Sequence, residues 1–303
     1  MSAAQASAAP PPSPARIASA FETACLLELD ALKPGNVHRY ADGHGMVVAQ
    51  FQASARAAAP AIARPDAAVG TRVLEAVQAS LAAAGCNTNL GIVLLCAPLA
   101  RAAQDLPAPG RSVEDAGRVE ALAGATAAVL AALDLDDARQ AYQAIALANP
   151  GGLGQVERHD VRAVATLDLR SAMVAAAGRD RIARQYACDF KDIFEISLPA
   201  LRRHLAAGAL PPAAVGALYL ELLARWSDSH IVRKFGDTVA QSVSEEAHQI
   251  LREWTATGDA AASQMALLRW DARLKSQGIN PGTTADLTVA TVFAHLLAAL
   301  PGS

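Results

Sequence analysis

Four short polar segments carry most of the side chains that could bind or transform a small molecule. The first runs from Lys33 to Met46 and combines a lysine, an arginine and two histidines around a Pro-Gly turn. Cationic side chains and exposed backbone N–H groups together suit an anion such as a phosphate. We expect phosphate binding here, with an ordinary turn of solvated charges as the alternative. The candidate residues are Lys33, Gly35, Asn36, His38, Arg39 and His44, among which His38 is also a catalytic candidate.

The second segment, Gly85 to Gly91, precedes a nearly uncharged apolar run. Its candidates, Asn87, Thr88 and Asn89, offer several directed donors and acceptors beside the free N–H groups of a helix start. Such groups suit a phosphate or a ribose hydroxyl. A purely structural role is an equal alternative, because Asn and Thr are also standard helix N-caps.

The third polar region joins residues 156–161 to the arginine-rich stretch 177–186. Its first part contributes carboxylates that could ligate a metal or act as a general base, and its second part a cationic wall for a polyphosphate. An ion pair between Asp180 and Arg184, four residues apart on an expected helix, is the structural alternative. The candidates are Glu157, Asp160, Arg179 and Asp180, together with Arg233 from a weaker polar loop at 226–237.

The fourth segment, Ile279 to Leu287, is a turn that leads into the last apolar run. Here Asp286 could bind Mg²⁺ or a substrate hydroxyl at a helix start, where the helix dipole favours a carboxylate. The alternative is a capping box formed by Thr283 and Asp286, three residues apart. The candidate residues are Asn280, Gly282, Thr283, Thr284 and Asp286, and the candidate metal ligands are Asp286 and Asp160.

The elements that would position these segments are helices. Alanine, the best helix former, accounts for 73 of the 303 residues, whereas the aromatic residues that favour strands make up only 4%. Apolar residues recur at spacings of three and four, as in Phe21, Cys25, Leu29 and Leu32. We expect helices at 16–32, 47–63, 71–84, 90–104, 112–133, 136–148, 166–188, 192–207, 212–227, 237–257, 260–277 and 284–300.

The gaps between these helices are mostly short, which predicts one compact all-α domain of about a dozen helices over residues 16–300. Residues 1–15, rich in Ala, Ser and Pro, are expected to be a disordered leader. They lack the basic and then apolar order of a signal peptide. A domain boundary near residues 149–154 is the alternative.

Charge and composition exclude several classes of protein. A net charge of −3 argues against nucleic-acid binding, which usually requires a basic surplus. No run of about 18 uncharged apolar residues occurs, so we expect no membrane span. The four cysteines are widely spaced and are expected to be small buried hydrophobes in a reducing cytoplasm. Walker, Rossmann, HExxH and GxSxG motifs are absent, so phosphate recognition would not use the common nucleotide-binding folds.

Taken in chain order, the motifs resemble those of the triphosphoribosyl-dephospho-CoA synthase family, from about Phe21 to Leu297. The resemblance implies an all-α enzyme that transfers the triphosphoribosyl group of ATP to the 2′-hydroxyl of 3′-dephospho-CoA. It further implies release of adenine, Mg²⁺ on the triphosphate and a product that is a prosthetic-group precursor. The motifs are Lys33-Pro34-Gly35 with Gly43-His44, the segment Gly85 to Gly91, and Pro281-Gly282-Thr283-Thr284-Ala285-Asp286-Leu287.

The resemblance also suggests roles for the candidates. An oxocarbenium-like transition state needs positioning, a base for the hydroxyl and an acid for adenine. Asp286 is then expected at Mg²⁺ or the attacking hydroxyl. Partners would be the small molecules ATP and dephospho-CoA or a related acceptor, with a homodimer as a possible assembly. Phosphates are expected at Lys33, His38 and Arg39, and ribose or phosphate oxygens at Asn87, Thr88 and Asn89.

Three departures from the family pattern mark a divergent branch, similar to relatives found beside one-carbon cofactor genes in methylotrophs and methanogens. His38 stands where the pattern has Asp, and Gly45-Met46 follows His44 where it has an Asp two residues on. Asn89-Leu90 replaces a His-Lys pair. The alternative functions are an ATP-dependent kinase or ligase of methanopterin or methanofuran biosynthesis, and a non-catalytic protein that retains a nucleotide pocket.

Overall fold

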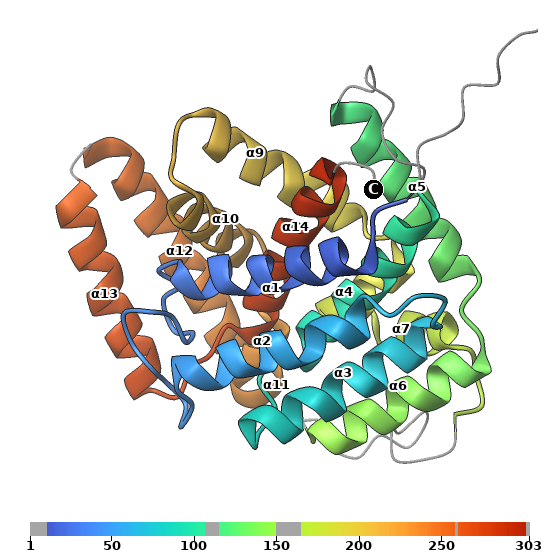
Figure 1. The fold of residues 1–303 in the computed structure, drawn as a ribbon. Coiled ribbons are helices and arrows are strands. Elements are labelled where there is room, and N and C mark those ends of the chain that lie inside the picture. The colour runs from blue at the N-terminus through green and yellow to red at the C-terminus, as the bar shows by residue number, and fades with distance from the viewer. Residues whose placement is uncertain (1–10, 107–114, 150–164, 258–259, 301–303) are drawn as a thin grey trace, which may run out of the picture.

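The computed structural model describes residues 11–106, 115–149, 165–257 and 260–300 (Figure 1). These residues form fourteen α-helices and one short π-helical segment and contain no strand, which confirms the all-α prediction. The elements are α1 (Pro14–Asp30), α2 (Val48–Ile62), α3 (Val69–Ala84), α4 (Leu90–Asp105), α5 (Asp115–Ala131), α6 (Leu135–Ala148), α7 (Leu169–Ala176), α8 (Arg181–Ala187), η1 (Asp192–Ser197, π-helical), α9 (Leu198–Ala206), α10 (Pro211–Arg225), α11 (Ser229–Phe235), α12 (Asp237–Thr257), α13 (Ala260–Ser276) and α14 (Gly282–Ala299).

Helix α14 forms the centre of the molecule and packs against α1, α4, α5 and α10. Figure 1 shows α2, α3 and α6 side by side, and α12 and α13 at another edge of the molecule beyond α10. By composition α14 is long and apolar enough to cross a membrane, with a mean hydropathy of 1.2 over 18 residues. However, 72% of that stretch is buried inside the protein, as in the core helix of a globular fold.

Two apolar clusters form the core. The larger cluster contains residues from every helix between α1 and α10 and from α14. The smaller cluster joins α10, α11, α12 and α13 to the turn before α14. Alanine lines both clusters, because a small side chain allows helices to approach closely. Cys25 and Cys96 are buried as predicted, whereas Cys86 and Cys188 are partly exposed, and all four are free.

The structure corrects two predicted elements. The helix expected at 166–188 is divided into α7 and α8, because Asp180 caps α8 by accepting hydrogen bonds from the N–H groups of Ile182 (2.8 Å) and Ala183 (3.1 Å). The predicted Asp180–Arg184 pair is therefore wrong, and Arg184 lies 3.5 Å from Asp192 instead. Residues 229–235, predicted as part of a polar loop, form helix α11. The expected leader falls mostly on residues 1–10, outside the described residues, and α1 already begins at Pro14.

One buried carboxylate caps two helices. Asp228, 2% exposed, accepts hydrogen bonds through Oδ1 from the N–H groups of His230 (2.8 Å) and Ile231 (3.1 Å) in α11. Through Oδ2 it accepts from the N–H group (2.7 Å) and hydroxyl (2.8 Å) of Thr284 in α14. The capping box expected of Thr283 and Asp286 is not formed, because α14 starts at Gly282 without a side-chain cap from its own segment.

Replacing Asp228 by alanine should therefore uncap both helices. A helix cap is worth about 0.5–2 kcal/mol, so the loss of two caps in Asp228→Ala is expected to lower the free energy of unfolding by about 1–4 kcal/mol. Urea unfolding followed by circular dichroism measures this loss. Asp168→Ala is the matched control, because Asp168 caps only α7 and is partly exposed. It should cost no more than about 1 kcal/mol; equal losses in the two variants would contradict the double cap.

Candidate functional site

The starts of several helices meet around Asp286. Gly91, at the start of α4, lies directly against the Asp286 carboxylate, and a Cβ added at Gly91 would overlap it and come within 2.7 Å of Ile182 in α8. Gly282, at the start of α14, lies against the ring of His230, whose Nδ1 would be 2.6 Å from an added Cβ. Glycine at both positions permits this close approach. Segments that are remote in the sequence therefore converge at one place.

The carboxylate of Asp286 is partly exposed and forms no hydrogen bond or ion pair with any residue that the structure describes. Burial raises the pKa of Asp286 well above its ordinary value of 3.8. The carboxylates of Asp228, Glu28 and Asp180 raise this pKa further, and Arg233 lowers it. A carboxylate without a partner among other carboxylates destabilises the folded state, and such groups are concentrated at functional sites.

Lys33 is fully buried, and its ammonium group donates hydrogen bonds to three other groups of the protein. Nζ donates to Glu28, to Asn36 Oδ1 (3.1 Å) and to the carbonyl of Val37 (2.8 Å). Burial lowers the pKa of Lys33 and raises that of Glu28, while their mutual attraction offsets part of both shifts. Because an ammonium group has only three donors, Lys33 has none left for the phosphate expected there.

The turn after Lys33 is held against the turn before α14. Gly35 adopts a left-handed φ of 83°, and an added Cβ would be 2.8 Å from Pro281 and 3.2 Å from the carbonyl of Ile279. Asn36 donates through Nδ2 to Asn280 Oδ1 (2.8 Å). Tyr219 of α10 donates its hydroxyl to the carbonyl of Pro34 (2.8 Å). The first and fourth polar segments of the sequence therefore form one packed unit.

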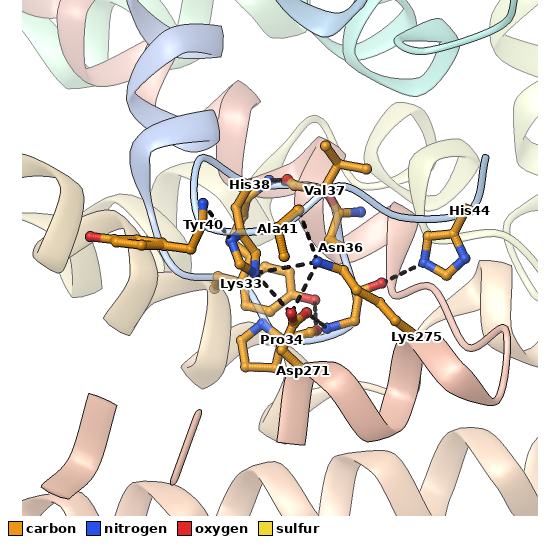
Figure 2. Close-up of polar contacts among 12 residues, drawn as sticks. Lys33, Pro34, Asn36, Val37, His38, Tyr40, Ala41, His44, Asp271 and Lys275 are labelled. Atoms are coloured by element: carbon orange, nitrogen blue, oxygen red, sulfur yellow. Dashed lines mark hydrogen bonds and ion pairs between the residues drawn. The ribbon is translucent and has the colours of Figure 1, made fainter. Parts of the chain in front are cut away.

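The remaining candidates of the first segment point in different directions, as Figure 2 shows for the two histidines. His38 is fully buried and faces Asp271 and Lys275 of α13, so in this arrangement it has no exposed atom with which to contact a substrate. His44 lies 2.8 Å through Nε2 from the carbonyl of Gly35 and is partly exposed. Arg39 is exposed, lies 3.8 Å from Asp30 and covers the ring of Tyr40.

The second segment is tied mainly to its own supporting helices. Thr88 donates to Ser54 Oγ (2.5 Å), and Asn89, although it precedes α4, donates to Ser80 Oγ (2.9 Å) instead of capping the helix. Asn87 accepts a hydrogen bond from the N–H group of Leu90 (3.2 Å). A purely structural role therefore accounts for Asn87, Thr88 and Asn89. The contact of this segment with Asp286 is made by Gly91.

The third region is only partly described. Glu157 and Asp160 lie outside the described residues, so their predicted roles remain predictions. Arg233 Nη1 lies 3.3 Å from Asp180 Oδ2, which joins α11 to the start of α8 near Asp286. Arg179 is exposed just before α8.

Sequence reasoning missed several residues that shape this site. Glu28 falls on the apolar stripe of α1, three residues after Cys25, and a charge on a buried stripe indicates a buried partner. The Asp228-Ser229 pair before His230 is a helix-start pattern. Asp271 has no such local signal. It accepts a hydrogen bond from the backbone N–H group of Gly35, which is 236 residues away in the sequence.

No group of three or more His, Cys, Asp or Glu side chains that could hold a metal occurs in the part of the chain that the structure describes. Mg²⁺ often binds through one or two carboxylates and completes its shell with substrate phosphates and water. The carboxylate of Asp286 fits that requirement, since a divalent cation would relieve the repulsion from its acidic neighbours.

Neutralising Asp286 should stabilise the protein. Its folded pKa is raised, so the ionised form destabilises the native state increasingly as pH rises above the ordinary value of 3.8. Asp286→Asn in metal-free buffer is therefore expected to raise Tm at neutral pH by about 2 °C or more. The difference should shrink as pH falls towards 4, where both states bind the proton.

Differential scanning calorimetry between pH 4 and 8 measures this effect. Asp30→Asn is the control, because it removes a half-exposed carboxylate that pairs only weakly with Arg39. Its Tm should stay close to that of the wild type. A lower Tm for Asp286→Asn at neutral pH would show that Asp286 supports the fold, contrary to its description as an unpaired group.

Comparison with known proteins agrees with the motifs. The family model described as ATP:dephospho-CoA triphosphoribosyl transferase, CitG, matches residues 14–303. The 2-(5''-triphosphoribosyl)-3'-dephosphocoenzyme-A synthase of Klebsiella pneumoniae is 32% identical over 108 residues, which span 35% of this chain and only 37% of that relative. A crystal structure from Archaeoglobus fulgidus, assigned as a triphosphoribosyl-dephospho-CoA synthase, matches with a TM-score of 0.61 at 27% identity and covers 81% of this chain and 98% of that chain. The resemblance seen in the motifs is thus confirmed, and the chain belongs to the CitG family of ATP:dephospho-CoA triphosphoribosyl transferases.

Proposed function

We propose that this protein transfers the triphosphoribosyl group of ATP to the 2′-hydroxyl of 3′-dephospho-CoA and releases adenine. One observation carries the proposal beyond family membership. The first and second motifs that resemble the family both contact the third, because Gly91 of the second touches Asp286 of the third, and Gly35 of the first touches Pro281 of the third. Motifs that share one substrate are expected to meet in this way.

The polar groups that the fold leaves open define where substrate would bind. Asp286, the hydroxyl of Thr283 and the ring of His230 make no hydrogen bond to other described side chains or backbone groups. Asn280 uses its carbonyl oxygen for Asn36, and its amide N–H groups remain available. These groups lie on the first turns of α14 and α11 and, for Asn280, in the turn before α14.

The triphosphate would be held by arginines and by the start of α14, where the helix dipole favours negative charge. Arg233 pairs with Asp180 and lowers the pKa of Asp286, and Arg179 is exposed before α8. Lys33 would not bind the triphosphate directly, because its ammonium group already donates to Glu28, Asn36 and the carbonyl of Val37. Asp286 would hold Mg²⁺, which neutralises phosphate charge when bound, with Asp160 as its predicted companion.

His230 is the open group best suited to accept the proton of the attacking hydroxyl. Burial, together with the cations Arg233 and Lys234, lowers the pKa of His230 to about 4. The imidazole is therefore neutral at physiological pH and able to take up a proton. A weak base suffices when the ribose C1 is already electron-poor in an oxocarbenium-like transition state.

Product analysis tests the proposal directly. Purified protein with ATP, dephospho-CoA and Mg²⁺ should release one adenine for each acceptor consumed, as measured by liquid chromatography. Omission of Mg²⁺ should abolish release. The appearance of ADP or AMP in place of adenine would overturn the proposal in favour of a kinase or ligase, and nucleotide binding without any product would indicate a binding protein.

The contact between Gly91 and Asp286 gives a mutational test. Gly91→Ala should displace the carboxylate and lower kcat by about 100-fold, the effect of a misplacement of about 1 Å at a reacting centre. Gly124→Ala in α5 is the matched control, since an added Cβ there meets no atom within 4 Å. It should leave turnover unchanged and stabilise the helix by about 0.5–1 kcal/mol. Full activity of Gly91→Ala would show that Asp286 is not at the reacting centre.

A further inference from the structure

Helix α13 holds the Lys33–Met46 loop through Asp271 and Lys275, two side chains one helical turn apart. Asp271 accepts a hydrogen bond from the N–H group of Gly35 (2.8 Å) and lies 3.3 Å from Nε2 of His38 (Figure 2). Lys275 donates to Asp271 (3.0 Å) and to the carbonyl of Ala41 (3.0 Å), and its aliphatic stem lies against Gly43. Both limbs of the loop are thereby held from one helix.

The hydrogen bonds fix the tautomer of His38. Nδ1 accepts from the backbone N–H group of Tyr40 (3.2 Å), which places the ring proton on Nε2, and Nε2 lies 3.3 Å from Asp271 Oδ2. Lys275 Nζ, 3.5 Å from the same Nε2, is a second donor that converges on that carboxylate. Asp271 therefore accepts hydrogen bonds from Gly35 and Lys275 and faces Nε2 of His38, and all three groups lose this carboxylate partner if it is removed.

The contacts of Asp271 are connected, through the Lys33–Asn36 turn, to the open groups of the site. Gly35, held by Asp271, packs on Pro281 and on the carbonyl of Ile279 in the turn before α14. The adjacent Asn36 bonds to Asn280 in the same turn. Asp271 itself is 2% exposed and touches none of the open groups. It can affect the site only through the Lys33–Asn36 turn.

We propose that Asp271, together with His38, is a positioning residue that fixes the Lys33–Asn36 turn and, through it, the start of α14. The part of this inference that concerns turnover rests on the proposed function, whereas the part that concerns the loop does not. His38 then supports the turn from the side of α13. It does not contact the substrate, contrary to the role expected from the sequence.

Two pairs of variants separate this role from a general loss of stability. In Asp271→Asn an amide nitrogen replaces one carboxylate oxygen, so a donor must face another donor, either at Gly35 or at His38 and Lys275. At position 38, glutamine places its amide nitrogen near the original Nε2 and keeps a donor towards Asp271. Asparagine keeps only the acceptor near Nδ1. The proposal therefore expects His38→Gln to be close to the wild type and His38→Asn to resemble Asp271→Asn.

Glu246→Gln is the matched control. Glu246 of α12 holds α13 through Trp270 Nε1 (2.6 Å) and Arg273 (3.1 Å to Oε1), but it has no contact with the loop among its described hydrogen bonds and ion pairs. It should loosen α13 without releasing the Lys33–Met46 loop. Comparison with Asp271→Asn therefore distinguishes loss of the contacts between the Asp271 carboxylate and the loop from weaker attachment of α13.

Hydrogen-exchange mass spectrometry of residues 33–46 gives a readout that does not need turnover. Asp271→Asn and His38→Asn should speed exchange in this segment by about tenfold or more, since the opening of a local unit then requires fewer contacts to break. His38→Gln and Glu246→Gln should not, and exchange in α4 should be unchanged in all variants. ¹⁵N-detected NMR of the wild type should show His38 as the Nε2–H tautomer.

In adenine release, Asp271→Asn and His38→Asn should lower kcat by about 100-fold with a smaller change in KM, as expected for lost positioning. Equal behaviour of His38→Gln and His38→Asn, or wild-type exchange in Asp271→Asn, would overturn the proposal. If the wild type releases no adenine, the proposed function fails, and exchange and NMR still decide whether Asp271 positions the loop.

Discussion

The carboxylate of Asp228 is the contact on which the arrangement of the site depends. It binds the N–H group of His230 through one oxygen and that of Thr284 through the other, across 56 residues of sequence. Since Gly282 precedes Thr284 by two residues, this bridge places the ring of His230 beside Gly282. Asp286, two residues after Thr284, is then directed to the start of α4.

The polar residues of the site divide into two groups with different physical roles. Lys33, Asn36, Asn89 and Thr284 have their hydrogen-bonding groups occupied by other parts of the chain. They hold backbone segments in place, and their removal would leave buried groups without partners. Asp286, Thr283 and His230 are held by those segments but have no described partner of their own. Catalytic sites commonly rely on such a rigid supporting layer behind a small number of open groups.

The sequence was informative about helices and about which segments are chemically unusual. Alanine content and apolar spacing were sufficient for most helix ranges, because these signals are local. The short helix α11 and the break before α8 were missed, since a helix of seven residues gives little periodicity and a single cap at Asp180 interrupts an otherwise helical pattern. The site partners could not be derived, because Asp271–Gly35 and Asp228–Thr284 depend on tertiary packing. Lys33 was interpreted as a phosphate ligand because a lysine in a turn is usually exposed, whereas Glu28 on the buried stripe of α1 takes up its charge.

Two of the three departures from the family pattern lie among the supporting contacts. His38, which stands where the pattern has Asp, adjoins a carboxylate that α13 supplies from Asp271. Asn89 bonds to Ser80, and Leu90, in place of a lysine, packs against the main apolar cluster. By contrast Gly91, Gly282 and Asp286, which form the contact between the motifs, all match the pattern. These two changes alter how the site is held and leave its open groups in place. This distribution favours retention of the family's chemistry over a new reaction on the same scaffold.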